Sequence, residues 1–282
     1  KEIRRIDPFI QYALTASDQA IKDADLFLDE IEKTRIGVSI GSGIGGLGSI
    51  EDNALILRDK GPRKISPFFV PGAIINMASG NVAIKYNLQG PNISIVSACS
   101  SAGHSIGYSA RTISYGDADI MITGGSEAGI TPLGLAGFNA AKALSTNNEN
   151  PESASCPWDK KRDGFLLGEG AGILILEELE SAKSRKAKIY GEVVGFGQSD
   201  DAYHITAPAE DGRGAYNAMV NALKDFKEDH DKIDYINAHG TSTPLGDVIE
   251  AKAIAEIFKG RENLSISSTK SMTGHLLGAA GA

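Results

Sequence analysis

The hydrophobic positions of this chain fall into two kinds of segment, and together they predict an α/β protein. Apolar residues at helical spacing over Phe9–Leu26 predict a helix. Further helices are expected over Ala102–Ile113, Ala215–Phe226 and Ala251–Phe258. Short apolar runs bounded by glycine or polar residues predict strands over Ile36–Ile40, Asn92–Ala98, Ala118–Gly125, Gly170–Leu179, Ala187–Gly197, Ile233–Gly240 and Leu264–Ser268. Because these runs do not alternate with polar residues, the sheets are expected to be largely buried between helical layers.

The order of these elements indicates two halves. The charged stretch Ser181–Lys188 is the expected boundary, which divides the chain into an N-terminal half, 1–185, and a C-terminal half, 186–282. The chain begins with Lys1 rather than Met and stops at Ala282 inside an apolar run. We therefore expect the first half to be incomplete at its start and the second at its end.

Composition restricts the class of protein. A formal charge of −8 over 282 residues argues against general nucleic-acid binding. No apolar run approaches the ~20 residues that cross a bilayer, and no secretory signal opens the chain. Two cysteines make no disulfide scaffold. The expected compartment is therefore reducing: the cytoplasm, or an organelle.

The glycine-rich stretch GSGIGG, Gly41–Gly46, formally matches a dinucleotide-binding pattern. That interpretation needs a second strand ending in an acidic residue about 20 positions further on. Asp59 lies near that distance, but the segment before it looks helical. The pattern favours a tight backbone turn, where glycine provides positive φ or close approach.

Cys99 lies in IVSACSSAGHSIG, where a predicted strand meets a predicted helix. The free N–H groups and positive dipole at a helix N-terminus favour a thiolate there. Small neighbours leave room for a substrate beside the sulfur, although many intracellular cysteines are only small buried side chains. Cys156 has no such setting and is interpreted as structural.

Two histidines also have unusual surroundings. His239 ends a predicted strand in NAHGTSTPLGD, and His275 follows Lys270 by five residues in STKSMTGHLLGAAGA. A strand-terminal histidine before a glycine projects to where α/β folds keep ligand crevices. No histidine pair has metal-ligand spacing on one helix, so no metal site is expected. His104 and His204 stay ambiguous, and His230 is expected at the surface.

The motifs around Cys99, His239 and His275 together resemble the β-ketoacyl-acyl-carrier-protein synthases, specifically the type II elongating enzymes. The resemblance extends over GPRKISPFFVP, PWDKKRDGFLLGEGAGILILEEL and SDDAYHITAP. It implies the thiolase-like fold, five α-β-α-β-α layers built from two similar halves, with Cys99 and His239 brought to a shared centre.

The resemblance also implies roles for individual residues. Cys99 would accept an acyl group, and the enzyme would then join it to decarboxylated malonyl-carrier protein in a Claisen condensation. The catalytic positions implied are Cys99, His239, His275 and Lys270. The histidines would donate N–H groups to developing negative charge, and Lys270 would orient and stabilise electrostatically. Thr241 and Thr243 would bind the phosphopantetheine arm, and Ile44 would line the acyl-chain pocket.

The resemblance implies no resident cofactor, because phosphopantetheine arrives on the acyl carrier protein. Carrier proteins are acidic, and local basic clusters match the family's docking positions, namely Lys1, Arg4, Arg5, Arg63, Lys64 and Lys142. A solvated face is the alternative explanation of these clusters. The family's members are homodimers, so the same assembly is expected here.

Three alternatives stay open at this stage. A polyketide-synthase ketosynthase domain would use the same residues on other acyl chains. A non-catalytic carrier-binding subunit would not need Cys99. A thiolase would need a second catalytic cysteine after Cys156, and this chain has none there. The family's gating-phenylalanine loop and the acidic partner of Lys270 are not in this sequence, and chain-length preference is not readable from it.

Overall fold

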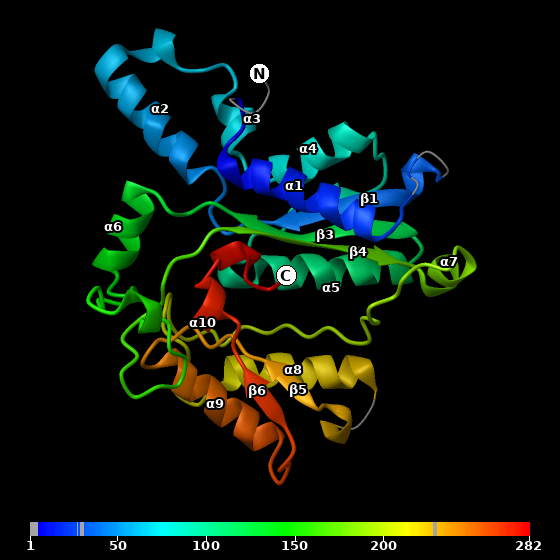
Figure 1. Ribbon diagram of the computed structural model, residues 1–282, viewed down its shortest axis with the longest axis vertical. Coiled ribbons are helices and arrows are strands. Elements are labelled where there is room, and N and C mark those ends of the chain that lie inside the picture. Colours follow the sequence, from blue (N-terminus) through cyan, green and yellow to red (C-terminus); the bar gives the residue numbers. More distant parts are fainter. Residues whose placement is uncertain (1–4, 27, 29–30, 228–229) are drawn as a thin grey trace. The chain divides into compact units, whose positions relative to one another are not determined.

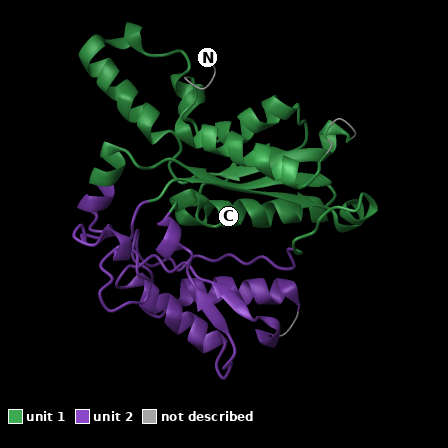
Figure 2. Ribbon diagram, viewed as in Figure 1, with its two compact units in different colours: residues 1–136, 168–192, 276–282 green, residues 137–167, 193–275 purple. Residues whose placement is uncertain are grey.

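A computed structural model describes residues 5–26, 28, 31–227 and 230–282. These residues form two compact units that interleave along the chain (Figure 2). Unit 1 contains residues 1–136, 168–192 and 276–282, and unit 2 contains residues 137–167 and 193–275. Within the described residues, no helix is both long and apolar enough to cross a membrane. The sequence-based halves, 1–185 and 186–282, stay a prediction.

Unit 1 is built on a four-stranded sheet in the order β2-β1-β3-β4. Its strands are β1 (Ile36–Gly41), β2 (Asn92–Ile93), β3 (Ile120–Glu127) and β4 (Gly170–Glu177). Its helices are α1 (Pro8–Asp23), α2 (Leu47–Lys60), α3 (Phe69–Ala73), α4 (Met77–Tyr86), α5 (Ser101–Ser114) and α7 (Leu179–Ser184). β1 runs parallel to β2 and β3, and β4 runs antiparallel to β3.

One face of this sheet carries the apolar core of unit 1. Helices α1 and α4 cover this face (Figure 1). Val38 and Ile122 of the sheet pack there in one cluster with Phe9 of α1 and Val82 of α4. Asp7 begins α1 by accepting a hydrogen bond from the Phe9 N–H, 3.3 Å away, and Pro8 fits the first helical position. Burial of these side chains against the sheet provides the main stabilisation of the layer.

Helix α5 packs against the opposite face of the same sheet, with an unusually short distance between the two backbones. A Cβ on Gly41 would lie 2.7 Å from the Ser101 carbonyl oxygen, and one on Gly125 would lie 2.6 Å from the Ala102 Cβ. Both distances are shorter than real Cβ contacts, so glycine is needed at these two strand positions. α5 therefore rests almost directly on the backbone of β1 and β3.

Unit 2 has a smaller, two-stranded parallel sheet. Its strands are β5 (Tyr235–Asn237) and β6 (Ser265–Ser267), and its helices are α8 (Arg213–Phe226), α9 (Gly246–Ile257) and α10 (Lys270–Thr273). α6 (Pro132–Ala140) begins in unit 1 and ends in unit 2. Ala238, Ile254 and Phe258 form the core of unit 2. β6 is exposed along its length, so the expectation of largely buried sheets is correct for β1 and β3 but wrong for β6.

All four predicted helices are present, as α1, α5, α8 and α9. The predicted strand over Ala187–Gly197 is wrong, because the described chain has no strand there. Its C-terminal part instead lies along α8. A Cβ on Gly197 would be 2.1 Å from the Ala218 oxygen, and the Phe196 N–H donates to Asp225. The apolar run therefore reflects packing on a helix rather than pairing in a sheet.

The strand predicted over Asn92–Ala98 is also shorter than expected, because only Asn92–Ile93 pairs with β1. Hydroxyl groups take over the backbone hydrogen bonds beyond it. Ser79 Oγ donates to the Ile93 oxygen at 2.8 Å, and the Ser97 N–H donates to Ser101 Oγ at 3.0 Å. Such side-chain bonds compete with a strand ladder. β5 is likewise confined to the middle of the predicted Ile233–Gly240 strand.

Candidate active site

Cys99 lies in a single 3-10 turn, Ala98–Ser100, immediately before the first residue of α5. The side chain is half-buried and belongs to no disulfide. Ala98 has a φ of 51°, a left-handed conformation that is costly for a residue with a Cβ. Ser101 Oγ stabilises this conformation by donating to the Ala98 oxygen at 2.7 Å. The expected position of Cys99 at a helix N-terminus is confirmed.

The glycine-rich turn of unit 1 lies beside this segment. A Cβ on Gly43 would lie 3.5 Å from the Ala98 oxygen. The N–H groups of Gly43 and Ile44 donate to the carboxylate of Glu127, at 2.6 Å and 3.1 Å. An internal anion therefore occupies the donors that a phosphate would need, and the interpretation as a tight turn is confirmed. Ile44 is half-buried.

His239 and His275 are brought together in unit 2. His239 follows β5 after one residue, and His275 follows the short helix α10. Their ring centroids are 5.2 Å apart, with the rings nearly perpendicular at 89°. Phe165 packs edge-on against the His275 ring, with centroids 5.1 Å apart. The His275 N–H donates to the Leu166 oxygen at 2.7 Å, which fixes the backbone of the histidine.

Both imidazoles are held in their neutral form. Desolvation by the surrounding protein lowers the pKa of His239 to about 4, and the Lys270 ammonium contributes to the decrease. As a residue, His239 keeps part of its surface accessible to solvent. The protein packed around the side chain still removes enough water to disfavour the charged imidazolium. Burial, together with smaller contributions from His239 and Lys270, lowers the pKa of His275 to about 3. At neutral pH each ring therefore offers one N–H donor and one acceptor nitrogen.

The loop after His239 is fixed by two acidic residues of α9. The Glu250 carboxylate accepts from the His239 N–H at 2.6 Å and from the Gly240 N–H at 2.8 Å. The buried Asp247 accepts from the Ser242 N–H at 3.1 Å. These bonds hold the turn that carries Thr241 and Thr243.

Thr241 and Thr243 present their hydroxyl groups as a pair. The two oxygens are 3.1 Å apart, and Thr241 is nearly buried while Thr243 is more open. Lys270 is the first residue of α10 and is 6% exposed. Ser155 Oγ donates to the Lys270 oxygen at 2.6 Å and thereby fixes the backbone of this lysine. The structure thus places Thr241 and Thr243 on the loop that follows His239, and Lys270 on the short helix that precedes His275.

The basic residues selected from the sequence have mixed outcomes. Lys1 and Arg4 lie outside the described residues. Arg5, Arg63 and Lys64 are exposed on unit 1, and the Arg5 guanidinium lies 4.4 Å from the centroid of the Phe68 ring. Lys142 is exposed on unit 2.

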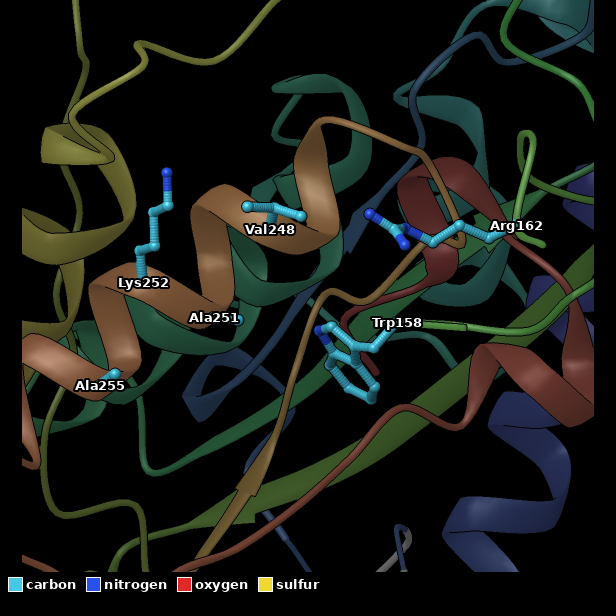
Figure 3. Close-up of a pocket in the computed structure, with 6 residues that line it drawn as sticks. All are labelled: Trp158, Arg162, Val248, Ala251, Lys252 and Ala255. Atoms are coloured by element: carbon cyan, nitrogen blue, oxygen red, sulfur yellow. The ribbon is translucent and has the colours of Figure 1, made fainter. Parts of the chain in front are cut away.

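Unit 2 also has a pocket of about 310 Å³ beside α9 (Figure 3). Its lining residues are Trp158, Arg162, Val248, Ala251, Lys252 and Ala255. Arg162 is not free to turn toward a ligand, because its guanidinium donates to the oxygens of Thr243 and Pro244 and lies 3.5 Å from Asp247. None of the residues selected from the sequence lines this pocket.

The sequence did not reveal three carboxylates that hold the backbone of the predicted site residues in place, namely Glu127, Asp247 and Glu250. Glu127 lies at least 83 positions from each of its donors, and Asp247 lies 89 positions from Trp158. Glu250 lies 10 and 11 positions from its donors, beyond the reach of a local motif. The only local signal was Glu127 itself, a charged residue at the end of the apolar run IMITGGSE. A charge in that position is unusual, because a buried carboxylate must be hydrogen-bonded.

The family of the chain follows from models that match nearly its whole length. The model described as "Beta-ketoacyl synthase, N-terminal domain" matches residues 1–182, and the model described as "Beta-ketoacyl synthase, C-terminal domain" matches residues 190–282. The chain therefore belongs to the β-ketoacyl synthase family, which is a family of acyltransferases.

Individual relatives agree with this assignment. A curated relative from Vibrio cholerae, named 3-oxoacyl-[acyl-carrier-protein] synthase 2, is 58% identical over all of this chain and 68% of its own length. A β-ketoacyl synthase structure from Burkholderia phymatum aligns with a TM-score of 0.92 and 38% identity, covering 99% of this chain and 67% of that one. A type II polyketide ketosynthase, solved with its acyl-carrier protein, aligns with a TM-score of 0.92 and 37% identity, covering 97% and 69%. The expected thiolase-like α/β fold is thus confirmed.

Proposed function

We propose that this chain catalyses the decarboxylative condensation of an acyl group with malonyl-acyl carrier protein, which yields 3-oxoacyl-acyl carrier protein and extends a fatty acid by two carbons. The observation that carries the proposal is the pair of neutral imidazoles, His239 and His275, beside Lys270 in unit 2. Curated relatives at 53–58% identity over the whole chain are named 3-oxoacyl-[acyl-carrier-protein] synthase 2, which agrees with this chemistry.

In the first half-reaction Cys99 is the nucleophile. Its thiolate attacks the acyl thioester, the carrier protein's phosphopantetheine thiolate leaves and takes up a proton, and an acyl-Cys99 thioester remains. The N-terminus of α5 favours the thiolate, and the Cys99 backbone N–H donates to the oxyanion of the tetrahedral intermediate. Ile44 contacts the acyl chain.

In the second half-reaction malonyl-carrier protein loses CO2. The electron pair of the broken C–C bond forms an enolate, and the N–H groups of His239 and His275 stabilise its thioester oxygen. The enolate carbon then attacks the acyl-Cys99 carbonyl, and the Cys99 thiolate is released. Lys270 contributes a positive charge near the developing anion, and Thr241 and Thr243 bind the pantetheine arm.

The proposed partner is the acyl carrier protein, and no resident cofactor or metal is required by this mechanism. Exposed basic residues support docking of an acidic partner, namely Arg5, Arg63 and Lys64 on unit 1 and Lys142 on unit 2. The solved polyketide ketosynthase is itself described in complex with an acyl-carrier protein. We place the enzyme in the cytoplasm, because two cysteines that form no disulfide fit a reducing compartment.

A homodimer is the proposed assembly. β2 is an edge strand of the unit 1 sheet, and exposed edge strands invite pairing with a second chain. Large apolar side chains are exposed on or next to β2, α4 and α5, namely Ile84, Ile93, Val96, Tyr108 and Tyr115. An apolar surface of this kind is typical of a permanent interface.

The test is intact-mass spectrometry of the purified protein after incubation with a saturated acyl-carrier protein, with Cys99→Ala as the matched variant. One acyl adduct is expected on the wild type and none on the variant. Addition of malonyl-carrier protein should discharge the adduct as a product two carbons longer. A folded wild-type protein that forms no adduct contradicts the proposal.

A second candidate is a polyketide ketosynthase, which the 37%-identical structural match supports. Both activities use the same half-reactions and differ in the acyl chain that is extended. A preference for 3-oxo or poly-oxo acyl donors over saturated ones in the same experiment would favour this second candidate.

A further inference from the structure

Glu127, the last residue of β3, is completely buried and accepts four hydrogen bonds. Oε1 accepts from Ser42 Oγ at 2.7 Å and from the Ile44 N–H at 3.1 Å. Oε2 accepts from the Gly43 N–H at 2.6 Å and from the Gly278 N–H at 2.9 Å. These donors fill both sides of the carboxylate and offset the cost of its burial.

The same carboxylate determines the conformation of the turn that carries Ile44. Two consecutive N–H groups, those of Gly43 and Ile44, point at Glu127. Ser42 extends the arrangement to the next residue, because its hydroxyl donates to Glu127 and accepts from the Gly45 N–H at 3.0 Å. The backbone around Ile44 is therefore held by one buried group rather than by a sheet or a helix.

Glu127 also joins this turn to residues 277–279, through its bond to the Gly278 N–H, and the turn lies near the segment that carries Cys99. A Cβ on Gly43 would lie 2.8 Å from Glu127 Oε2 and 3.5 Å from the oxygen of Ala98, the residue before Cys99. A Cβ on Gly278 would lie 2.2 Å from the Gly43 nitrogen. The turn is therefore packed tightly against residues 277–279, and a Cβ on Gly43 would be in ordinary van der Waals contact with the Cys99 segment. We expect a change at Glu127 to shift Ile44 relative to Cys99.

We infer that Glu127 is a positioning residue that sets which acyl chains Cys99 accepts, by fixing the backbone of Ile44 beside the cysteine segment. The inference rests on the proposed function. Glu127 is completely buried and its four bonds are to protein donors, so it acts through its neighbours. It acts through Ile44, whose place determines the space left for an acyl chain on the Cys99 sulfur.

The decisive variant is Glu127→Gln, which keeps the shape but replaces one acceptor oxygen by an NH2 donor. Two of the four hydrogen-bond donors then face a donor, and the turn relaxes. Rates of Cys99 acylation are measured by intact mass with hexanoyl- and hexadecanoyl-carrier protein. We expect the ratio of the two rates to change by about tenfold relative to the wild type. A general loss of stability would lower both rates and leave their ratio unchanged.

Glu177→Gln is the matched control. Glu177 lies at the opposite end of the same strand pair, opposite Ile120 in the register, and its carboxylate is bonded to Arg185 at 2.7 Å with 6% of the side chain exposed. This variant should lower the melting temperature without changing the ratio. Ser42→Ala removes one of the four donors to Glu127. It should change the ratio of the two acylation rates in the same direction as Glu127→Gln, but by less. This variant tests the inference if Glu127→Gln does not fold.

The outcomes separate the two claims. Absence of an adduct on wild-type Cys99 with either donor removes the proposed function and this inference with it. A wild type that is acylated, together with variants whose ratio stays within about twofold of it, overturns the inference alone.

Discussion

The His275 ring meets the His239 ring edge to face, with centroids 5.2 Å apart, and both rings are neutral at physiological pH. Two neutral imidazoles side by side form a donor pair without a net positive charge of their own. The positive charge nearby comes from Lys270, and it opposes protonation of both rings. The pair therefore behaves as a fixed hydrogen-bonding device rather than as an acid and a base that exchange protons.

The first prediction concerns the pH dependence of malonyl decarboxylation. Free histidine changes charge near pH 6.5, whereas these two pKa values are lowered to about 4 and about 3. The rate on acylated enzyme should show no inflection between about pH 5.5 and 8. Release of CO2 measured across that range checks this. An inflection near pH 6.5 that disappears in His239→Gln would contradict the assignment of neutral rings.

The second prediction concerns stability and follows from the same shifts. Between about pH 6.5 and 4 the unfolded chain binds protons at these histidines, whereas the folded chain does not. The free energy of unfolding should therefore decrease as the pH is lowered through this window. The buried His275 alone contributes a slope of up to ~1.4 kcal/mol per pH unit. Urea unfolding at several pH values measures the slope, which should be shallower in His275→Gln.

The third prediction concerns Glu250, which accepts from the N–H groups of His239 and Gly240. Glu250→Gln leaves one of these donors opposite an NH2 group, which costs about 1–3 kcal/mol. We expect decarboxylation to slow by about tenfold while acylation of Cys99 changes little, because the loop belongs to unit 2. Glu256→Gln, at an exposed position of the same helix, is the control and should behave like the wild type. Equal losses in both half-reactions would show that Glu250 stabilises the protein without a specific effect on His239.

The fourth prediction concerns carrier-protein docking. Charge reversal at Arg63 or Lys64 should raise the KM for acyl-carrier protein by about fivefold each, with little change in kcat. The effect should shrink at high salt, because exposed charges are screened. Lys259→Glu, at an exposed position after α9, tests whether any loss of positive charge has the same result. If the Arg63 and Lys64 variants change KM no more than Lys259→Glu does, the solvated-face explanation of the basic clusters is correct.

The sequence was sufficient for the parts of the site that lie at the ends of elements. Cys99 precedes a helix of clear periodicity, and His239 follows a short apolar strand, so local pattern placed both correctly. The segment Ala187–Gly197 was misread because an apolar run indicates burial but does not reveal whether the neighbour is a strand or a helix.

The positioning carboxylates were missed for a different reason. Glu127 bonds to donors 83, 84, 85 and 151 positions away, so no local pattern contains the interaction. The Ser79 hydroxyl, which helps to shorten the Asn92–Ala98 strand, also acts at a distance, because it bonds to the Ile93 oxygen 14 positions away. The Ser101 hydroxyl acts locally, on the N–H of Ser97 four positions before it. Local spacing predicts elements and reactive groups, whereas the groups that hold them in place are visible only after folding.

The close approach of α5 to the sheet bears on how mutational scans of this enzyme should be read. Gly41 and Gly125 admit no side chain, because a Cβ would collide with Ser101 or Ala102. Such collisions would displace the helix that follows Cys99. In a scan scored by growth, these two glycines should be as intolerant as the cysteine itself, although neither takes part in the chemistry. A map of intolerant positions would therefore include the residues that hold Cys99 in place as well as Cys99 itself. Only a separate measurement of folding would distinguish the structural positions from the catalytic one.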